Sequence, residues 1–118
     1  PRVSLAGEIF VEGGFYDYDA KYNDPTSRFE APAVLTEPEM DLVRSYAAEA
    51  FTALGCSGLA RVDFFFEERG RGFLLNEVNT MPGFTPISGF PKMWEASGVT
   101  YPELCDFLVD VALKRSGA

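Results

Sequence analysis

The chain has 118 residues, of which 47% are hydrophobic and 24% charged, enough to bury the core of one globular domain. Its net charge of −8 argues against a non-specific nucleic-acid binder, because such proteins need a basic surface to displace phosphate counterions. No apolar run reaches the length of a membrane span, no signal-peptide pattern opens the chain, and Cys56 and Cys105 fit no CxxC spacing. We therefore expect a cytoplasmic protein with two buried free thiols and no membrane or nucleic-acid partner.

The first half of the chain predicts a strand, a long loop and a helix. Residues 3–11 have the composition of a strand, and residues 13–32 are dense in turn formers and aromatics. Thr36 is a helix N-cap, and Glu39, three residues later, completes a capping box. Gly55 ends the helix. The apolar residues between these signals recur on one helical face, which we expect to be buried: Met40, Val43, Ala47, Ala50, Phe51 and Leu54.

The second half predicts a β-hairpin and a last helix. Residues 58–66 and 73–78 are apolar strands on either side of a charged turn that contains glycine. The last helix begins at a second capping box, Thr100 with Glu103. Its buried face is expected to consist of Leu104, Phe107, Leu108 and Val111. Helices packed on one face of a mainly antiparallel sheet are typical of an α+β fold, which is the fold class we predict.

Four polar side chains of the hairpin come together if its turn is centred on Gly70. Asp63 then lies opposite Glu77, and Arg61 opposite Asn79, with all four on one face of the hairpin. Two carboxylates directly across from each other destabilise a hairpin unless a positive charge compensates them. A divalent cation could supply it, and two carboxylates with an amide oxygen suit Mg²⁺ better than zinc. The alternative is a solvated sheet face on which Arg61 neutralises Asp63, and spacing alone leaves both open.

Four motifs in the chain resemble one known family. "GLARVDFFF" followed by "LLNEVNTMPGFT" is similar to the C-terminal part of D-alanine–D-alanine ligases, in the ATP-grasp superfamily. "GEIF" and "FYDYDAKY" match the same family upstream, so the resemblance covers nearly the whole chain. It implies that residues 1–118 form the C-terminal part of an ATP-grasp domain. It also implies an ATP-dependent ligase that joins two D-alanines through a D-alanyl phosphate, for peptidoglycan precursor synthesis.

The resemblance implies roles for the polar residues of the hairpin. Asp63, Glu77 and Asn79 would bind two Mg²⁺, with Mn²⁺ as a substitute, which bridge the ATP phosphates and the acyl phosphate. Arg61 would stabilise negative charge on the phosphoryl group and on the tetrahedral intermediate, a task suited to a fixed bidentate donor. Without the resemblance, Arg61 is only the salt-bridge partner of Asp63. The backbone N–H of Gly83 would help to hold the oxyanion, although a glycine there could equally be only a turn residue.

The resemblance also implies residues that bind the two substrates. Ser88 would hold the carboxylate of the second D-alanine, with the backbone N–H of Gly89 beside it, whereas a loop serine is otherwise more often a turn former. Lys21 would close on the nucleotide phosphates, Tyr22 would join a hydrogen-bond network over the substrate, and Phe15 would lie next to the adenine pocket. The alternative for aromatics in such a loop is a small hydrophobic cluster.

Other functions stay open at this point. Ligases of this family are much longer, so the N-terminal domain and the first half of the ATP-grasp are expected to be absent. We expect a homodimer for the full-length enzyme and no activity for the chain alone, which could instead be a non-catalytic module that binds Mg²⁺, a nucleotide or a protein. Another ATP-grasp carboxylate–amine ligase is a further alternative. Relatives that use D-lactate carry a histidine in the loop that here reads "AKY", and this chain has none, which favours an amine acceptor. The small residue at Gly89 leaves D-serine open as that acceptor.

Overall fold

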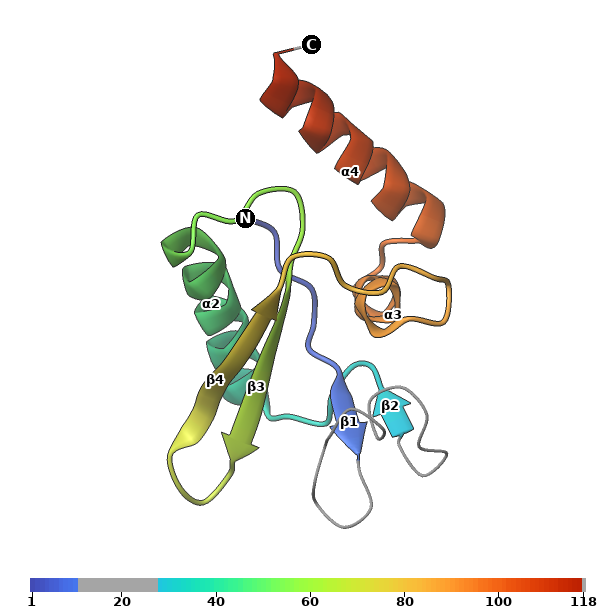
Figure 1. The fold of residues 1–118 in the computed structure, drawn as a ribbon. Coiled ribbons are helices and arrows are strands. Elements are labelled where there is room, and N and C mark those ends of the chain that lie inside the picture. The colour runs from blue at the N-terminus through green and yellow to red at the C-terminus, as the bar shows by residue number, and fades with distance from the viewer. Residues whose placement is uncertain (11–27, 118) are drawn as a thin grey trace.

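The computed structural model describes residues 1–10 and 28–117 of the chain. They form an α+β fold with two antiparallel strand pairs and three helices, which confirms the predicted fold class (Figure 1). Helix α2 packs against both strands of the longer hairpin, and α3 packs against α4. In chain order the elements are β1 (Glu8–Phe10), β2 (Arg28–Glu30), α2 (Glu37–Ala53), β3 (Arg61–Glu67), β4 (Gly72–Asn79), α3 (Gly89–Ala96) and α4 (Tyr101–Ser116).

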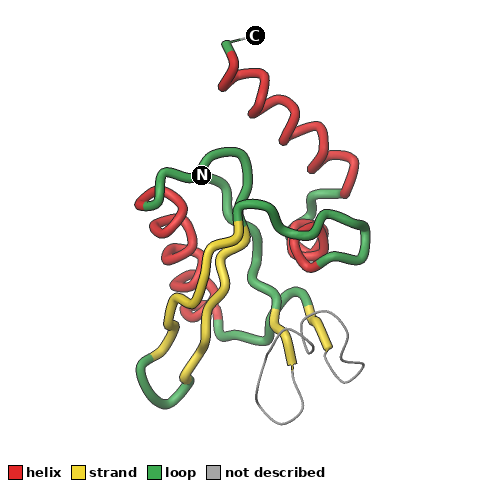
Figure 2. The backbone as a smooth tube through the Cα atoms, viewed as in Figure 1, coloured by secondary structure: helices red, strands yellow, loops and turns green. Residues whose placement is uncertain are grey.

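Three elements differ from the sequence prediction. The predicted first strand is reduced to β1, because most of the residues before it form an extended loop (Figure 2). Strand β2 pairs with β1 and falls in a segment that its turn formers marked as loop. Helix α3 was not predicted either. It has eight residues, too few for a clear apolar period, yet Pro91 in its first turn and Gly98 with a φ of 91° after its end are ordinary helix signals.

Both capping boxes are confirmed. The backbone N–H of Glu39 donates to Thr36 Oγ1 at 3.3 Å, and Glu39 Oε1 accepts from the backbone N–H of Thr36 at 2.8 Å. Thr100 and Glu103 repeat this arrangement at the start of α4. Gly55 follows α2 with a φ of 68°, so a glycine does end this helix in the left-handed conformation.

The segment before β1 connects helices that are far apart in sequence. Its backbone groups bond to side chains: the N–H of Leu5 donates to Ser97 Oγ after α3 at 2.8 Å, and the carbonyl of Val3 accepts from Arg44 Nη2 of α2 at 2.7 Å. The segment therefore passes between α2 and α3 as an extended strap (Figure 1). These bonds satisfy backbone groups that lack a neighbouring strand.

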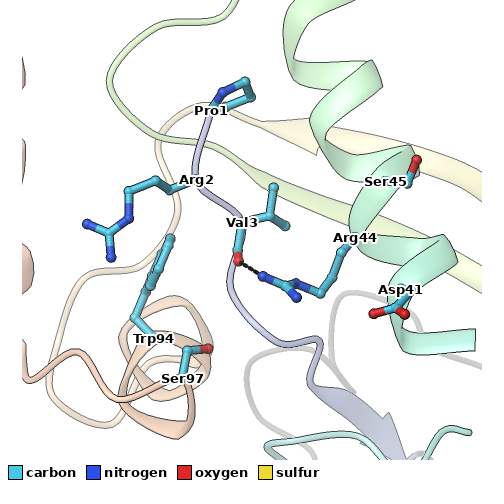
Figure 3. A pocket seen from close by; sticks show the side chains of 8 residues that line it. All are labelled: Pro1, Arg2, Val3, Asp41, Arg44, Ser45, Trp94 and Ser97. Atoms are coloured by element: carbon cyan, nitrogen blue, oxygen red, sulfur yellow. Dashed lines mark hydrogen bonds between the residues drawn. The ribbon is translucent and has the colours of Figure 1, made fainter. Parts of the chain in front are cut away.

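A cavity of about 510 Å³ lies beside this strap, between α2 and α3 (Figure 3). The guanidinium of Arg2 stacks over Trp94 at 5.6 Å and over Phe107 at 5.0 Å, which ties the strap to α3 and α4. Arg44 Nε is buried there and has no hydrogen-bond partner among the described residues. None of the residues that the sequence singles out for function lines this cavity.

The buried core of the described residues is small. The sequence predicts one buried face for α2 and one for α4. This is confirmed at Val43 and Leu104, which are buried, and wrong at Leu54 and Phe107, which are 63% and 38% exposed. Other large apolar side chains are also exposed, on the hairpin and in the loop after it: Phe65, Phe66, Leu75, Met81 and Ile87. Cys56 and Cys105 are free, as predicted, but only half-buried. In the part of the chain that the structure describes, no helix is both long and apolar enough to cross a membrane.

Candidate metal and substrate site

The β3–β4 hairpin has the register that the sequence predicted at its polar end. Arg61 pairs with Asn79, and Asp63 pairs with Glu77. Residues paired across an antiparallel hairpin project from the same face, so these four side chains share one face of the hairpin. The structure therefore brings these four predicted site residues together on the hairpin.

A β-bulge makes this register possible. Beyond Asp63 the pairing shifts by one residue, so that Phe64 lies opposite Leu75 and Asn76 has no residue of its own across the hairpin. Continued without the bulge, the pairing near the turn would place Asn76 opposite Asp63 and turn Glu77 to the other face. The sequence predicts the same pairs from a turn centred on Gly70 and no bulge. The structure reaches them with a tighter turn and one extra residue in β4.

Arg61 compensates the two carboxylates. Its Nε donates to Asp63 Oδ1 at 2.8 Å and its Nη2 to Asp63 Oδ2 at 2.9 Å, while Nη2 lies 3.8 Å from Glu77 Oε1. The side chains of Arg61 and Asp63 are 20% and 24% exposed, and that of Glu77 is 47% exposed. The salt bridge that the sequence left open is therefore present. Among the described residues, Arg61, Asp63 and Glu77 together carry a net negative charge, which can attract a metal ion.

Asn79 ends β4 with its side chain held by the next loop. Its Oδ1 accepts from the backbone N–H of Met81 at 2.9 Å, an Asx-type turn that fixes the amide. Among the described residues no three His, Cys, Asp or Glu side chains form a metal cluster. The donors on this face are two carboxylates and an amide oxygen, a set that fits Mg²⁺ with water and phosphate oxygens in its remaining positions.

The loop after β4 brings Gly83 next to Ser88. A β-carbon at Gly83 would lie 3.2 Å from Ser88 Oγ, closer than a side chain accommodates without a shift. Gly83 does not have a positive φ, so this proximity, and not the turn, is what favours glycine here. Ser88 is the N-cap residue of α3, but its hydroxyl makes no capping bond. It bonds instead to Thr85, through the backbone N–H at 3.1 Å and the hydroxyl at 2.7 Å.

Phe84 anchors this loop to the two C-terminal helices. Its ring lies 6.0 Å from that of Phe90 in α3 and 5.4 Å from that of Tyr101 in α4. The Tyr101 hydroxyl donates to the backbone carbonyl of Phe84 at 2.7 Å. Sequence reasoning missed both Thr85 and Tyr101. A pair of hydroxyl residues three apart, before a helix start, is the signal that could have pointed to Thr85.

The remaining predicted residues have different outcomes. Gly89 is the first residue of α3, and a β-carbon there would contact the Phe29 ring of β2 at 3.4 Å, an ordinary packing distance. Phe15, Lys21 and Tyr22 lie outside the described residues. The structure thus places the predicted site residues of the hairpin on one face of it, and it brings Gly83 close to the Ser88 side chain.

Comparisons with known proteins identify the family of this chain. The family described as D-ala D-ala ligase C-terminus matches residues 1–110. A D-alanine–D-alanine ligase of Acetivibrio thermocellus is 51% identical over 115 residues, which are 98% of this chain and 31% of the relative. The VanG D-Ala:D-Ser ligase from Enterococcus faecalis has a TM-score of 0.79 at 35% identity, covering 92% of this chain and 31% of that one. The ligase from Bacillus anthracis complexed with ATP has a TM-score of 0.67 at 31% identity, covering 74% and 30%.

The chain thus spans about a third of the length of the relatives that it matches. The match to the family includes the hairpin, the loop that follows it and most of the last helix. The resemblance inferred from the sequence motifs is confirmed over this range. The chain belongs to the family of D-alanine–D-alanine ligase C-terminal regions.

Proposed function

We propose that this chain is the metal- and acceptor-binding part of an ATP-dependent ligase that joins two D-alanines. The observation that carries the proposal is the polar face of the hairpin, Arg61, Asp63, Glu77 and Asn79, in a chain of this family. Because the chain spans about a third of its relatives, residues outside it complete the nucleotide site. We expect the complete enzyme to be a cytoplasmic homodimer that serves peptidoglycan precursor synthesis.

The reaction has two steps. The carboxylate of one D-alanine takes the γ-phosphoryl group of ATP, which gives an acyl phosphate and ADP. The amine of the second D-alanine then attacks the activated carbonyl carbon, and phosphate leaves with the bonding electrons of the C–O bond while the nitrogen loses a proton. Most of the catalysis of such transfers comes from positioning and charge stabilisation, which are tasks for the hairpin and the loop after it.

The hairpin residues divide these tasks. Asp63, Glu77 and Asn79 would hold two Mg²⁺ or Mn²⁺, and the metal supplies Lewis-acid stabilisation of the phosphate oxygens when it is bound. Arg61 keeps its positive charge at all physiological pH values, and Asp63 fixes the plane of its guanidinium through two hydrogen bonds. A fixed planar cation is suited to stabilising the negative charge of a phosphoryl group and of a tetrahedral intermediate.

The loop and the start of α3 would hold the acceptor. We assign the carboxylate of the second D-alanine to the Ser88 hydroxyl and the backbone N–H of Gly89, at the N-terminus of α3, where the helix dipole favours an anion. The backbone N–H of Gly83 would stabilise the oxyanion. By the family resemblance, Lys21 and Phe15 bind the nucleotide and Tyr22 lies over the substrate.

A second candidate function is ligation of D-alanine to D-serine. The similarity to the VanG D-Ala:D-Ser ligase favours it, as does the absence of a side chain at Gly89 beside the proposed acceptor site. Both candidates share the metal site and the first step of the reaction, so only the acceptor distinguishes them.

A chimera tests the proposal. The matching C-terminal region of the Acetivibrio thermocellus relative is replaced by this chain, and ADP release and dipeptide are measured with D-alanine, with and without D-serine. We expect D-alanyl-D-alanine from the chimera and none from a matched chimera that carries Asp63→Asn. Preference for D-serine would establish the second candidate. A folded chimera that binds ATP and forms no dipeptide would overturn both. The isolated chain is expected to release no ADP.

A further inference from the structure

Thr85 holds the hydroxyl of Ser88 in place. Its backbone N–H donates to Ser88 Oγ at 3.1 Å, and its own hydroxyl lies 2.7 Å from the same atom. A third hydrogen bond, from the backbone N–H of Ser88 to the carbonyl of Thr85 at 3.0 Å, closes the backbone turn between the two residues. The position of Ser88 Oγ is thus set by one residue, three places earlier in the chain.

We propose that Thr85 is a positioning residue that turns the proton of Ser88 toward the carboxylate of the acceptor amino acid. The inference rests on the proposed function of Ser88 as a carboxylate ligand. A serine hydroxyl can accept two hydrogen bonds and donate one. The Thr85 N–H takes one of the two acceptor positions of Ser88 Oγ, so the direction of the hydroxyl–hydroxyl bond decides what Ser88 offers to a ligand.

Two arrangements of the hydroxyl pair are possible. If Ser88 donates to Thr85, its only proton points back into the loop and it cannot bind an anion. If Thr85 donates, Ser88 accepts two bonds, and its proton is directed away from Thr85. A carboxylate accepts hydrogen bonds only, so it selects the second arrangement. The chain Thr85 O–H to Ser88 O–H to carboxylate is then polarised in one direction, which strengthens each of its bonds.

The surroundings of Ser88 agree with this role. A serine at an N-cap position ordinarily accepts a bond from the first turn of its helix, but the side chain of Ser88 does not cap α3. Its hydroxyl is held by Thr85 in place of that bond. On another side, Gly83 leaves free the space that a β-carbon would occupy 3.2 Å from Ser88 Oγ. The hydroxyl is therefore both fixed in position and open to a ligand.

The competing explanation is purely structural, with the hydroxyl pair serving only to tighten the loop. The two explanations differ in which kinetic constants respond. Loss of a loop-tightening bond lowers stability and affects all substrates, whereas loss of a positioning bond affects the substrate that Ser88 binds. Thr85 is exposed, so its replacement is expected to leave folding intact.

The test uses the active chimera with Thr85→Val, which keeps the backbone N–H and the shape but removes the hydroxyl. We expect KM for the second D-alanine to rise about 10-fold, as for one lost hydrogen bond to a charged partner, with kcat and KM for ATP within about 2-fold. Thr85→Ser should restore KM. Because Thr85 acts through Ser88, Thr85→Val added to Ser88→Ala should raise KM no further than Ser88→Ala alone.

The outcomes separate this inference from the function on which it rests. A chimera that forms no dipeptide overturns the proposed function, and the inference with it. An active chimera in which Thr85→Val leaves KM for the second D-alanine unchanged overturns the inference alone. Additive effects of Thr85→Val and Ser88→Ala do the same. Should Thr85→Val unfold the protein, Thr85→Ala is measured in its place, with the same result expected.

Discussion

Arg61 and Asp63, two residues apart on β3, form a bidentate ion pair on the face of the hairpin that also carries Glu77. Nε and Nη2 of the guanidinium each donate to one oxygen of the carboxylate, at 2.8 and 2.9 Å. Alternate residues of a strand project from the same face, so the sequence places both groups there. Together they place a fixed cation beside carboxylate oxygens. A phosphoryl-transfer site would have this arrangement, and so would a surface ion pair without a catalytic role.

Arg61→Lys should leave the fold intact and lower turnover of the complete enzyme on the order of 10²–10³-fold. Lysine keeps the positive charge and can still pair with Asp63, but it has no planar fork that holds two oxygens at once. Steady-state ADP release by the chimera measures the loss, and circular dichroism checks the fold. Arg71→Lys is a matched control, since Arg71 binds the Glu67 carboxylate by the same fork near the turn. Normal turnover in folded Arg61→Lys would make Arg61 only the salt-bridge partner of Asp63.

Glu77→Gln should abolish most Mg²⁺-dependent turnover and change the free energy of unfolding without metal by no more than about 0.5 kcal/mol. A neutral amide is a poorer ligand for a hard cation than the carboxylate that it replaces. The ion pair with Arg61 is weak in the metal-free protein, because Glu77 Oε1 lies 3.8 Å from Arg61 Nη2 and the Glu77 side chain is 47% exposed. Thermal melts without metal, beside an Mg²⁺ titration of ADP release, make the comparison. A lower melting temperature with normal turnover would show that Glu77 is a structural ion-pair partner and no metal ligand.

Gly83→Ala should raise KM for the second D-alanine and lower turnover, with little change in KM for ATP. The added methyl group would lie 3.2 Å from Ser88 Oγ, so the hydroxyl must move away from the position that Thr85 sets. The φ of Gly83 is not positive, so alanine brings no backbone strain. Initial rates against D-alanine and ATP measure the effect. Pro86→Ala, in the same loop, is the control, and equal effects of both variants would mean that the loop responds only as a whole.

Glu103→Ala should lower the melting temperature at neutral pH and have little effect in acid. Thr100 donates to the Glu103 carboxylate from its hydroxyl and from its backbone N–H, and these bonds lower the pKa of Glu103 below its usual range. A carboxyl group whose pKa is lower in the folded protein stabilises it above the pKa of the unfolded chain. That stabilisation is lost as the pH falls through the folded pKa. Melts from pH 7 to pH 3 of both proteins should converge, and a constant difference would exclude the carboxylate as its source.

Local features of this fold could be predicted because neighbouring residues determine them. A capping box needs only Thr36 and Glu39 three residues apart, and its bonds form within one helical turn. The hairpin register depends on a short turn and on alternating side chains, so the pairing of Asp63 with Glu77 was accessible. The bulge beside Asp63 was not, because it is one extra residue in β4 with no composition signal of its own. The predicted turn without a bulge and the observed tighter turn with a bulge lead to the same residue pairs at the polar end of the hairpin.

The sequence by itself determined the two capped helices, the hairpin and the family, because capping, alternation and motifs are read along the chain. Only the tertiary structure decided which groups meet across long separations. It pairs β1 with β2, ties the N-terminal strap to Arg44 and Ser97, and holds the loop after β4 on Tyr101. These contacts join residues from 17 to 92 positions apart. No local pattern specifies them, because they depend on how the helices and strands pack once each has formed.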